Sequence, residues 1–441
     1  MPLLNKSIPN LINGVSQQPD TLRLSSQAES QINGFSSVVE GLKKRPPSNH
    51  IAKISSSSFT NPFLHTINRD TTERYVVVLQ NNSIKVFDVD GTEKTVVLQT
   101  NASNYLTSSN PRQEYVCVTV ADFTFILNKN KTVSMANTTS PAKVEQAVYT
   151  VLQGVNNVEY SITIDGNTFT HTTASSGAIS TKGIRDALKN AISLTNITIA
   201  NLGDSSFSII KSTGTLTTSA SDGFGDQASQ VVKDEVQNFS DLPLPAINNM
   251  VVSVVGDAQN SFDNYFVKYE ENNRIWKETV EPNTVIEIDK DTMPHVLIRT
   301  ADGNFRFTQA DGSSYTISGT SYDVPTYGNR VVGDLESSPN PSFINRKIND
   351  IFFHRNRLGF LSSESVVMSR ASEFFDFYPE TVTDVLDTDP IDINVSHTKV
   401  SVLRHAIPFN EELLVFSDQT QFTICLLYTS DAADDSLRVD L

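Results

Sequence analysis

The sequence predicts a mainly β protein, in which strand meanders like the blades of a β-propeller follow an N-terminal platform region and carry one small inserted α+β module. Three observations lead to this prediction. Hydrophobic residues make up only 38% of the chain, and Ser, Thr and Asn fill the gap. These polar residues alternate with Val, Ile, Phe and Tyr, which is the pattern of half-buried strands. Turn signals such as Asn-Asn and Asp-Gly separate the runs at roughly 8–12 residues.

Length and charge narrow the class of protein. The 441 residues suggest two to four domains, because a domain takes roughly 100–200 residues. The chain holds 34 Lys and Arg against 50 Asp and Glu, a formal net charge of −16, so tight binding of nucleic acid through its phosphates is not expected. Residues 1–12 lack the parts of a secretion signal, and no apolar run approaches a membrane span. Two cysteines cannot build a disulfide scaffold.

Residues 1–144 are predicted to form an N-terminal arm and a β-rich platform with the first propeller strands. The spacing of four apolar residues within Ser26–Gly41 favours a helix. These residues are Ala28, Ile32, Phe35 and Val39. From Phe63 to Ser134 the chain then reads as one strand after another, and Cys117 is interpreted as a small buried residue rather than a reactive thiol.

A short basic cluster, Lys43, Lys44 and Arg45, follows the helix candidate and precedes two prolines. The prolines prevent a helix from continuing here. The cluster is weak evidence for a nucleic-acid-binding patch. A solvated loop, or a salt-bridging contact with an acidic neighbouring subunit, accounts for it better.

Residues 145–239 are predicted to be an inserted α+β module with its own core. An amphipathic helix is expected within residues 180–192, able to pack on the strands Tyr160–Ile164 and Phe207–Ile210. One face of this helix carries Ile184, Leu188 and Ile192. A second, short helix is predicted around Asp226–Phe239.

Residues 240–424 return to strands and are predicted to be an incomplete β-propeller-like region. Two stretches, 350–370 and 401–424, share the order of apolar strand, polar turn, second apolar strand and edge strand. Loose strand-only repeats of roughly 40–60 residues are typical of propeller blades. Residues 425–441 are predicted not to be native, because their first part, CLLYTSDAADD, matches the translation of a transposase-type sequencing adapter.

No pattern in the sequence marks a catalytic, metal or cofactor site, and no cofactor is expected. The seven His are not paired at metal-ligand spacing, and neither GxSxG nor a P-loop occurs. Asp384, Asp387, Asp389 and Asp392 could hold a hard cation, but they lack the Gly and the terminal Glu of an EF-hand loop, so a solvated loop is favoured. Trp276 and its aromatic neighbours could form a sugar platform, but strand aromatics are more often core residues.

Two stretches resemble one known family. Asn10–Pro47 contains GVSQQPD and EGLKKRPP, which resemble the N-terminal signature of the tail tubular protein B family, the nozzle proteins of short-tailed, T7-like bacteriophages. Phe343–Thr423, with IFFHRNRLGFLSSESVVMSR and LLVFSDQTQF, resembles the propeller region of the same family. Residues 145–239 match only loosely. Family members are longer, so the chain resembles a C-terminally truncated member without the distal nozzle domain.

The resemblance implies a structural protein of the virion, assembled in the cytoplasm of the bacterial host, and not an enzyme. In this family the copies form a sixfold ring below the adaptor ring of tail tubular protein A type. Tail fibres dock near the junction of the rings, viral DNA passes through the lumen without sequence-specific binding, and the assembled tail meets the host envelope.

The two N-terminal segments are specific to the family but contain few apolar residues for a core, so we expect them to work in assembly rather than in the fold. The candidate interface residues are Gly14, Val15, Ser16, Gln17, Gln18, Pro19, Lys43, Lys44, Arg45 and Pro46.

Two other functions stay open at this point. One is a virion-associated hydrolase that degrades envelope polysaccharide or peptidoglycan. The other is a host-receptor or tail-fibre docking module built on residues 145–239. A glycosidase needs two carboxylates that converge in a cleft, whereas a ring subunit needs a large subunit face.

Overall fold

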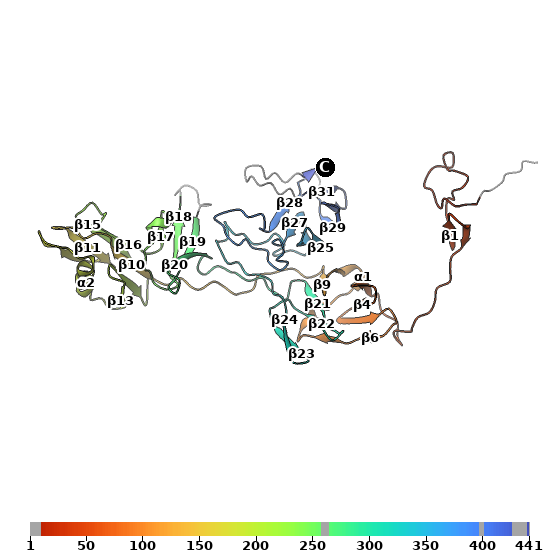
Figure 1. Ribbon diagram of the computed structural model, residues 1–441, viewed down its shortest axis with the longest axis horizontal. Coiled ribbons are helices and arrows are strands. Elements are labelled where there is room, and N and C mark those ends of the chain that lie inside the picture. The colour runs from red at the N-terminus through yellow and green to blue at the C-terminus, as the bar shows by residue number, and fades with distance from the viewer. Residues whose placement is uncertain (1–9, 257–263, 397–400, 426–438, 441) are drawn as a thin grey trace, which may run out of the picture. The chain divides into compact units, whose positions relative to one another are not determined.

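The computed structural model describes residues 10–256, 264–396, 401–425 and 439–440. The chain divides into two compact units, residues 1–56 and residues 57–441, and strands dominate it (Figure 1), as the sequence predicts. Among the described residues, one α-helix exceeds a single turn, α2 (Thr181–Ala191). No helix in the described part is long and apolar enough to cross a membrane.

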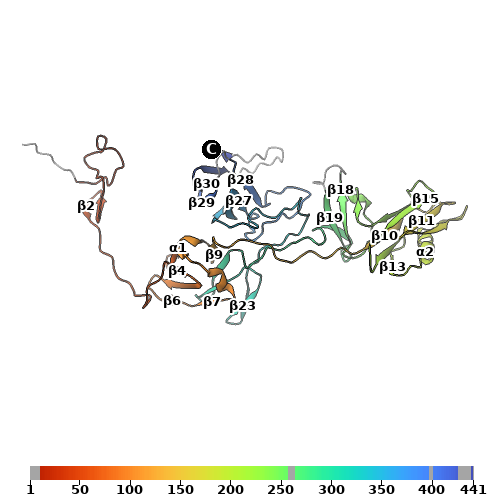
Figure 2. The ribbon, with the colours of Figure 1, turned by 180° about the vertical axis from the view of Figure 1, so that it is seen from behind.

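The first unit contains a short antiparallel hairpin of β1 (Gly34–Ser37) and β2 (Gly41–Lys44), labelled in Figures 1 and 2. Gly34 lies opposite Lys44, and Ser37 lies opposite Gly41. The helix predicted over Ser26–Gly41 is therefore wrong. Its apolar residues do not pack on a partner in this unit, and a short helix depends on such packing for its stability.

Three sheets of the second unit are four-stranded antiparallel meanders, the strand order of propeller blades. The first consists of β3 (Phe63–Asn68), β4 (Arg74–Gln80), β5 (Ser83–Asp88) and β6 (Glu93–Lys94). The second consists of β25 (Asp350–His354), β26 (Arg357–Ser362), β27 (Ser365–Met368) and β28 (Ile391–Asn394). The third consists of β29 (Leu403–Phe409), β30 (Glu412–Ser417), β31 (Gln421–Cys425) and β32 (Val439–Asp440).

A fourth sheet is split by a long insertion. Its strands, in spatial order, are β7 (Val96–Leu98), β22 (Phe305–Thr308), β21 (His295–Arg299), β9 (Phe123–Asn128) and β8 (Tyr115–Val120). Two short helices, η1 (Ala102–Leu106) and α1 (Pro111–Glu114), precede β8. Because β9 and β21 pair antiparallel, the whole chain between them leaves this sheet and returns to it.

The four sheets meet through their terminal strands. β3 contacts β8, β8 contacts β25, and β25 contacts β29, and each of these is the last strand at one edge of its sheet. Neighbouring blades of a propeller meet in the same way, through their inner strands. A closed propeller is not found among the described residues, so the incomplete propeller-like region stays a prediction.

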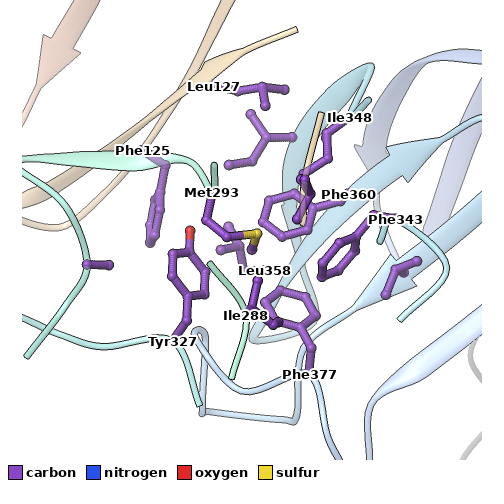
Figure 3. Packing of buried hydrophobic residues seen from close by; sticks show 14 of the residues in the cluster. Phe125, Leu127, Ile288, Met293, Tyr327, Phe343, Ile348, Leu358, Phe360 and Phe377 are labelled. Carbon is purple, nitrogen blue, oxygen red and sulfur yellow. The ribbon is translucent and has the colours of Figure 1, made fainter. Parts of the chain in front are cut away.

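An aromatic core joins the fourth sheet to the second meander (Figure 3). Phe343 makes edge-to-face contacts with Phe360 and Phe377, at ring-centroid distances of 5.5 and 5.3 Å. Phe125 of β9 belongs to the same cluster. Edge-to-face aromatic pairs add roughly 0.5–1.5 kcal/mol beyond burial of their area, so this cluster holds neighbouring sheets together.

The insertion begins with a module of two sheets and α2. One sheet has the order β13 (Ile197–Leu202), β14 (Ser206–Lys211), β10 (Gln146–Val151) and β16 (Ser229–Val232). The other has the order β12 (Asn167–Thr172), β11 (Glu159–Ile164) and β15 (Thr218–Asp222). The helix predicted within residues 180–192 is confirmed, and Ser180 caps it by accepting a hydrogen bond from the Gly183 N–H at 3.4 Å. Ile184 and Leu188 are buried in the core between the sheets.

The second predicted helix, around Asp226–Phe239, is wrong. The segment forms β16, then β17 (Glu235–Val236) and one turn of 3-10 helix, η2 (Phe239–Asp241). β16 pairs with β10, which places Val232 in a second core. Pairing with a buried strand therefore outweighs the local helical pattern.

A further sheet, with the order β17, β18 (Val251–Val255), β19 (Asn264–Glu270) and β20 (Ile275–Thr279), packs on the outer side of the module. Val148 and Val232 of the module share this core with Val252 and Val267. The hairpin of β23 (Ser314–Ile317) and β24 (Thr320–Asp323) completes the strands. The boundaries drawn at residues 144, 239 and 424 stay predictions, and residues 426–438 and 441 of the predicted adapter segment lie outside the described residues.

Candidate assembly interface

The GVSQQPD segment forms a bridged turn. Val15 makes a parallel bridge with Ala28. The Ala28 N–H donates to the Gly14 carbonyl at 2.8 Å, and the Ser16 N–H donates to the Ala28 carbonyl at 3.0 Å. Gly14 has φ +70, a left-handed conformation that glycine adopts without steric cost. These bonds give an otherwise polar segment a defined backbone.

Arg23 stabilises the end of this turn through hydrogen bonds. Its guanidinium donates to Asp20 Oδ1 at 2.7 Å and to the Gln18 carbonyl at 3.0 Å. The Pro19 carbonyl accepts from the backbone N–H groups of Leu22 and Arg23. The side chain of Arg23 is only 18% exposed, whereas that of Asp20 is 85% exposed. The segment is thus ordered by polar contacts, while its apolar side chains take no part.

The EGLKKRPP segment differs from the expected loop, because Lys43 and Lys44 lie in β2. Lys43 forms an ion pair with Glu40, and its Nζ lies 6.0 Å from the centroid of the Phe35 ring. The Arg45 N–H donates to the Asn33 carbonyl at 2.8 Å and closes the hairpin. Strand pairing with β1 replaces the solvated loop that the two prolines suggested, and only Arg45 of the cluster follows the strand.

Apolar side chains of the arm, residues 10–56, are exposed to an unusual degree. None of the described residues of the arm belongs to a buried hydrophobic cluster. Eleven large apolar residues are exposed: Ile12, Val15, Leu22, Leu24, Ile32, Phe35, Val38, Val39, Leu42, Ile51 and Ile54. Exposed apolar surface of this kind marks an interaction site.

The arm also differs in charge from the rest of the chain. Residues 1–56 contain six Lys and Arg and three Asp and Glu, a formal charge of +3. Residues 57–441 contain the other 28 Lys and Arg and 47 Asp and Glu, a formal charge of −19. Opposite potentials steer association and select partners. The arm is therefore suited to an acidic surface.

The acidic residues Asp384, Asp387 and Asp389 lie in a structured loop, and Asp392 lies in β28. Arg357, buried at 1% exposure, donates to the backbone carbonyls of Asp387 and Asp389 at 2.6 and 2.5 Å. The Asp392 carboxylate accepts from the Ser342 N–H at 2.7 Å. No group of three His, Cys, Asp or Glu in the described part of the chain has the geometry of a metal site. Sequence reasoning missed Arg357, since nothing in its pattern signals a buried arginine.

Two other residues singled out from the sequence belong to the core. The Trp276 Nε1–H donates to the Pro243 carbonyl at 3.0 Å, and its ring lies 5.4 Å from that of Tyr269. It is a core residue and not a sugar platform. Burial raises the pKa of the Cys117 thiol well above its usual range, which keeps the thiol protonated and inert.

The fold and the arm together define a β-rich subunit of a larger structure, with an ordered but coreless segment available for contact with other chains. The chain matches the model of the bacteriophage nozzle protein family over residues 1–432, and it belongs to this family. The tail tubular protein gp12 of Escherichia phage T7 is 36% identical over 444 aligned residues. The alignment covers 96% of this chain and 53% of that relative, so the chain spans about half the length of the curated relative it matches.

Family membership confirms the resemblance seen in the sequence. The chain is a structural protein of the phage tail and a virion component, assembled in the host during infection. Two solved structures are only weakly similar to the chain. The extracellular domain of BT4673 from B. thetaiotaomicron is 10% identical with a TM-score of 0.17, covering 82% of this chain and 50% of its own. The endosialidase of phage phi92 is 10% identical with a TM-score of 0.16, covering 82% and 45%. Likenesses this weak carry no argument.

Proposed function

We propose that the chain is a subunit of the ring-shaped nozzle of a short phage tail, and that the arm, residues 10–56, makes the contact between subunits. The main support for this proposal comes from the arm. A segment without a core buries little apolar surface of its own, so its exposed apolar side chains are stabilised when they pack on another surface. The candidate interface residues Gly14–Pro19 and Lys43–Pro46 lie within this arm.

The proposed partners follow from the family resemblance. They are other copies of the chain in a sixfold ring, an adaptor ring protein of tail tubular protein A type, a tail fibre protein, and the host envelope in the assembled tail. Viral DNA passes through the ring without sequence-specific binding. The net charge of −16 supports this, because each phosphate neutralised by a basic residue would add affinity and slow the passage of DNA.

We infer that the protein is not an enzyme. Support comes from membership of a structural tail protein family and from Trp276, which packs against a buried core. A hydrolase would turn over envelope polysaccharide or peptidoglycan, and the activity would disappear when one carboxylate is changed to its amide. We expect no turnover.

Deletion of the arm tests the proposed function. The five buried clusters lie within residues 57–441, so a variant lacking residues 1–56 is expected to keep the circular dichroism and melting temperature of the full chain. Sedimentation velocity and negative-stain microscopy, with and without the adaptor protein, then compare assembly. We expect the full chain to associate and the deletion variant to stay monomeric. Equal assembly of the two proteins would exclude the arm as the contact.

A further inference from the structure

We propose that the tip of the β1–β2 hairpin of one copy docks into a cavity of about 630 Å³ beside the sheet β17–β20 of the next copy. This inference rests on the proposed function, because it names the surface that the arm meets. A knob on one surface and a cavity on another make a head-to-tail contact, and such contacts close into a ring when the rotation between copies permits.

The cavity lies against the face of the sheet that points away from the buried core. Val251 lies opposite Lys268, and Ser253 lies opposite Phe266, across β18 and β19, and all four line the cavity. Their neighbours Val252 and Val267 point the other way, into the buried core. The remaining wall comes from residues 140–144, just before β10, and residues 279–283, at the end of β20, together with Gln146, Asp234 and Asn249. Its apolar lining is Pro141, Ala142, Val144, Val251, Phe266, Val280 and Pro282.

The hairpin tip presents a matching apolar knob. Val38 and Val39 stand between β1 and β2 and are 85% and 92% exposed. The Ser37 hydroxyl accepts from the backbone N–H groups of Val39 and Glu40, at 3.3 and 3.4 Å, which fixes the turn. Because the turn is ordered before any contact, little conformational entropy is lost when the two valines are buried.

Charges at the tip and in the cavity are complementary. Lys268 is half-buried, and among the described residues it has no hydrogen-bond or ion-pair partner, whereas Lys143 at the cavity pairs with Asp234 at 3.0 Å. A partly buried ammonium group without a partner favours an incoming carboxylate. Glu40, next to the two valines, supplies one. Its present partner, Lys43, lies at an exposed site, where such pairs contribute little.

The surroundings of the cavity suit the rest of the arm. Val280 bridges Gly333, and Val331 and Leu335 beside it are 54% and 59% exposed, so apolar surface continues beyond the cavity. Glu278, one residue before the lining residue Thr279, accepts from Thr381 and Val382 and so anchors an acidic loop nearby. That loop contains Asp384 and Asp387. These carboxylates can meet the basic residues that follow the hairpin tip.

Cross-linking between differently labelled copies tests the contact. Two proteins are prepared in a Cys425→Ser background, one with V39C and the other with V144C. The two proteins are mixed and treated with a short bifunctional maleimide. The matched control is a mixture of the V39C protein with a T170C protein, because Thr170 is exposed on β12. We expect covalent dimers from the V39C and V144C mixture in clear excess over the control. No dimers, or equal yields in both mixtures, would overturn the proposal.

A charge exchange gives a second, independent readout. E40K and K268E should each weaken self-association measured by sedimentation, roughly tenfold, the effect of about 1.4 kcal/mol. A mixture of the E40K and K268E proteins should recover most of the association that each protein loses alone. Failure to recover overturns the assigned pairing. If deletion of the arm abolishes assembly but no cross-link forms, the proposed function stands and the docking site is wrong; if deletion changes nothing, both are wrong.

Discussion

The ring of Phe352 lies over Gly359 in the neighbouring strand and fills the space that a side chain there would need. The two residues face each other across β25 and β26. A Cβ atom on Gly359 would lie 2.1 Å from Cζ of Phe352. Phe352 is 2% exposed and belongs to the core shared by the second and third meanders, so its ring cannot move aside without disturbing that core.

Gly359→Ala is expected to destabilise the protein by about 1–3 kcal/mol, the usual cost of overpacking a core. Urea unfolding followed by circular dichroism measures the change. Gly183→Ala in α2 is the matched control. There a Cβ meets no atom nearer than 3.9 Å, so the same substitution should stabilise by about 0.4–1 kcal/mol. A neutral effect of Gly359→Ala would show that the ring does not restrict this position.

His295 is a buried histidine that the protein keeps neutral. Its ring stacks on Tyr105 at 4.1 Å between centroids, with 9° between the planes, and Nδ1 lies 3.0 Å from the Met293 carbonyl. Burial lowers the pKa of His295 to about 4. In the unfolded chain the imidazole takes up a proton near pH 6.5.

The stability that His295 contributes should therefore be present above about pH 6.5 and be lost as the pH falls toward 4, because the unfolded chain binds a proton that the folded protein does not. His295→Phe keeps an aromatic ring against Tyr105 and removes the titrating group. We expect the melting temperature of this variant to vary less between pH 6.5 and 4 than that of the wild type. Equal slopes for the two proteins would exclude His295 as the cause.

The spacing of apolar residues predicted α2 correctly, but the helix that it predicted over Ser26–Gly41 is wrong. In α2, Ile184 and Leu188 meet the strands of two sheets, and Ser180 caps the helix. Ile32 in the arm is 87% exposed and packs on nothing in its unit. Spacing alone does not show whether a partner surface exists, and most of the stability of a short helix comes from that packing.

Strand patterns predicted the mainly β class but not the two-sided burial of β10. Every residue of Gln146–Val151 is buried, because Tyr149 faces the core with α2 while Val148 faces the core with β18 and β19. The sequence therefore suggested a free-standing module where the structure has two cores on one strand. At the candidate interface, the resemblance located the arm, but only the structure exposes Val38 and Val39 at its tip.

The module, residues 145–239, is expected to fold on its own, since its inner core involves only its own residues. Thermal unfolding followed by circular dichroism should be cooperative for this fragment. A longer fragment, residues 143–281, should be more stable because it also covers Val148 and Val232. Val148→Ser should cost the longer fragment about 0.5–3 kcal/mol and the shorter one much less. A random-coil signal from the shorter fragment would show that it is not a domain.

The basic cluster should act on assembly and not on folding. Lys43 forms an ion pair with Glu40 at an exposed site, and exposed ion pairs contribute roughly 0–1 kcal/mol. Replacing Lys43, Lys44 and Arg45 by Ser should therefore change the free energy of unfolding by no more than about 0.5 kcal/mol. Association with other copies should become slower and depend less on salt, since charges at the rim of an interface act mainly on the association rate.

The control for this triple variant removes the same charge elsewhere. Arg74, Arg112 and Lys182 are exposed and lie outside both the arm and the docking cavity, so their replacement by Ser should leave the rate of assembly and its salt dependence close to those of the wild type. Light scattering at two salt concentrations compares the three proteins. If both triple variants slow assembly equally, net charge alone is responsible; if the arm variant assembles at the wild-type rate at low and at high salt, the cluster has no part in the contact.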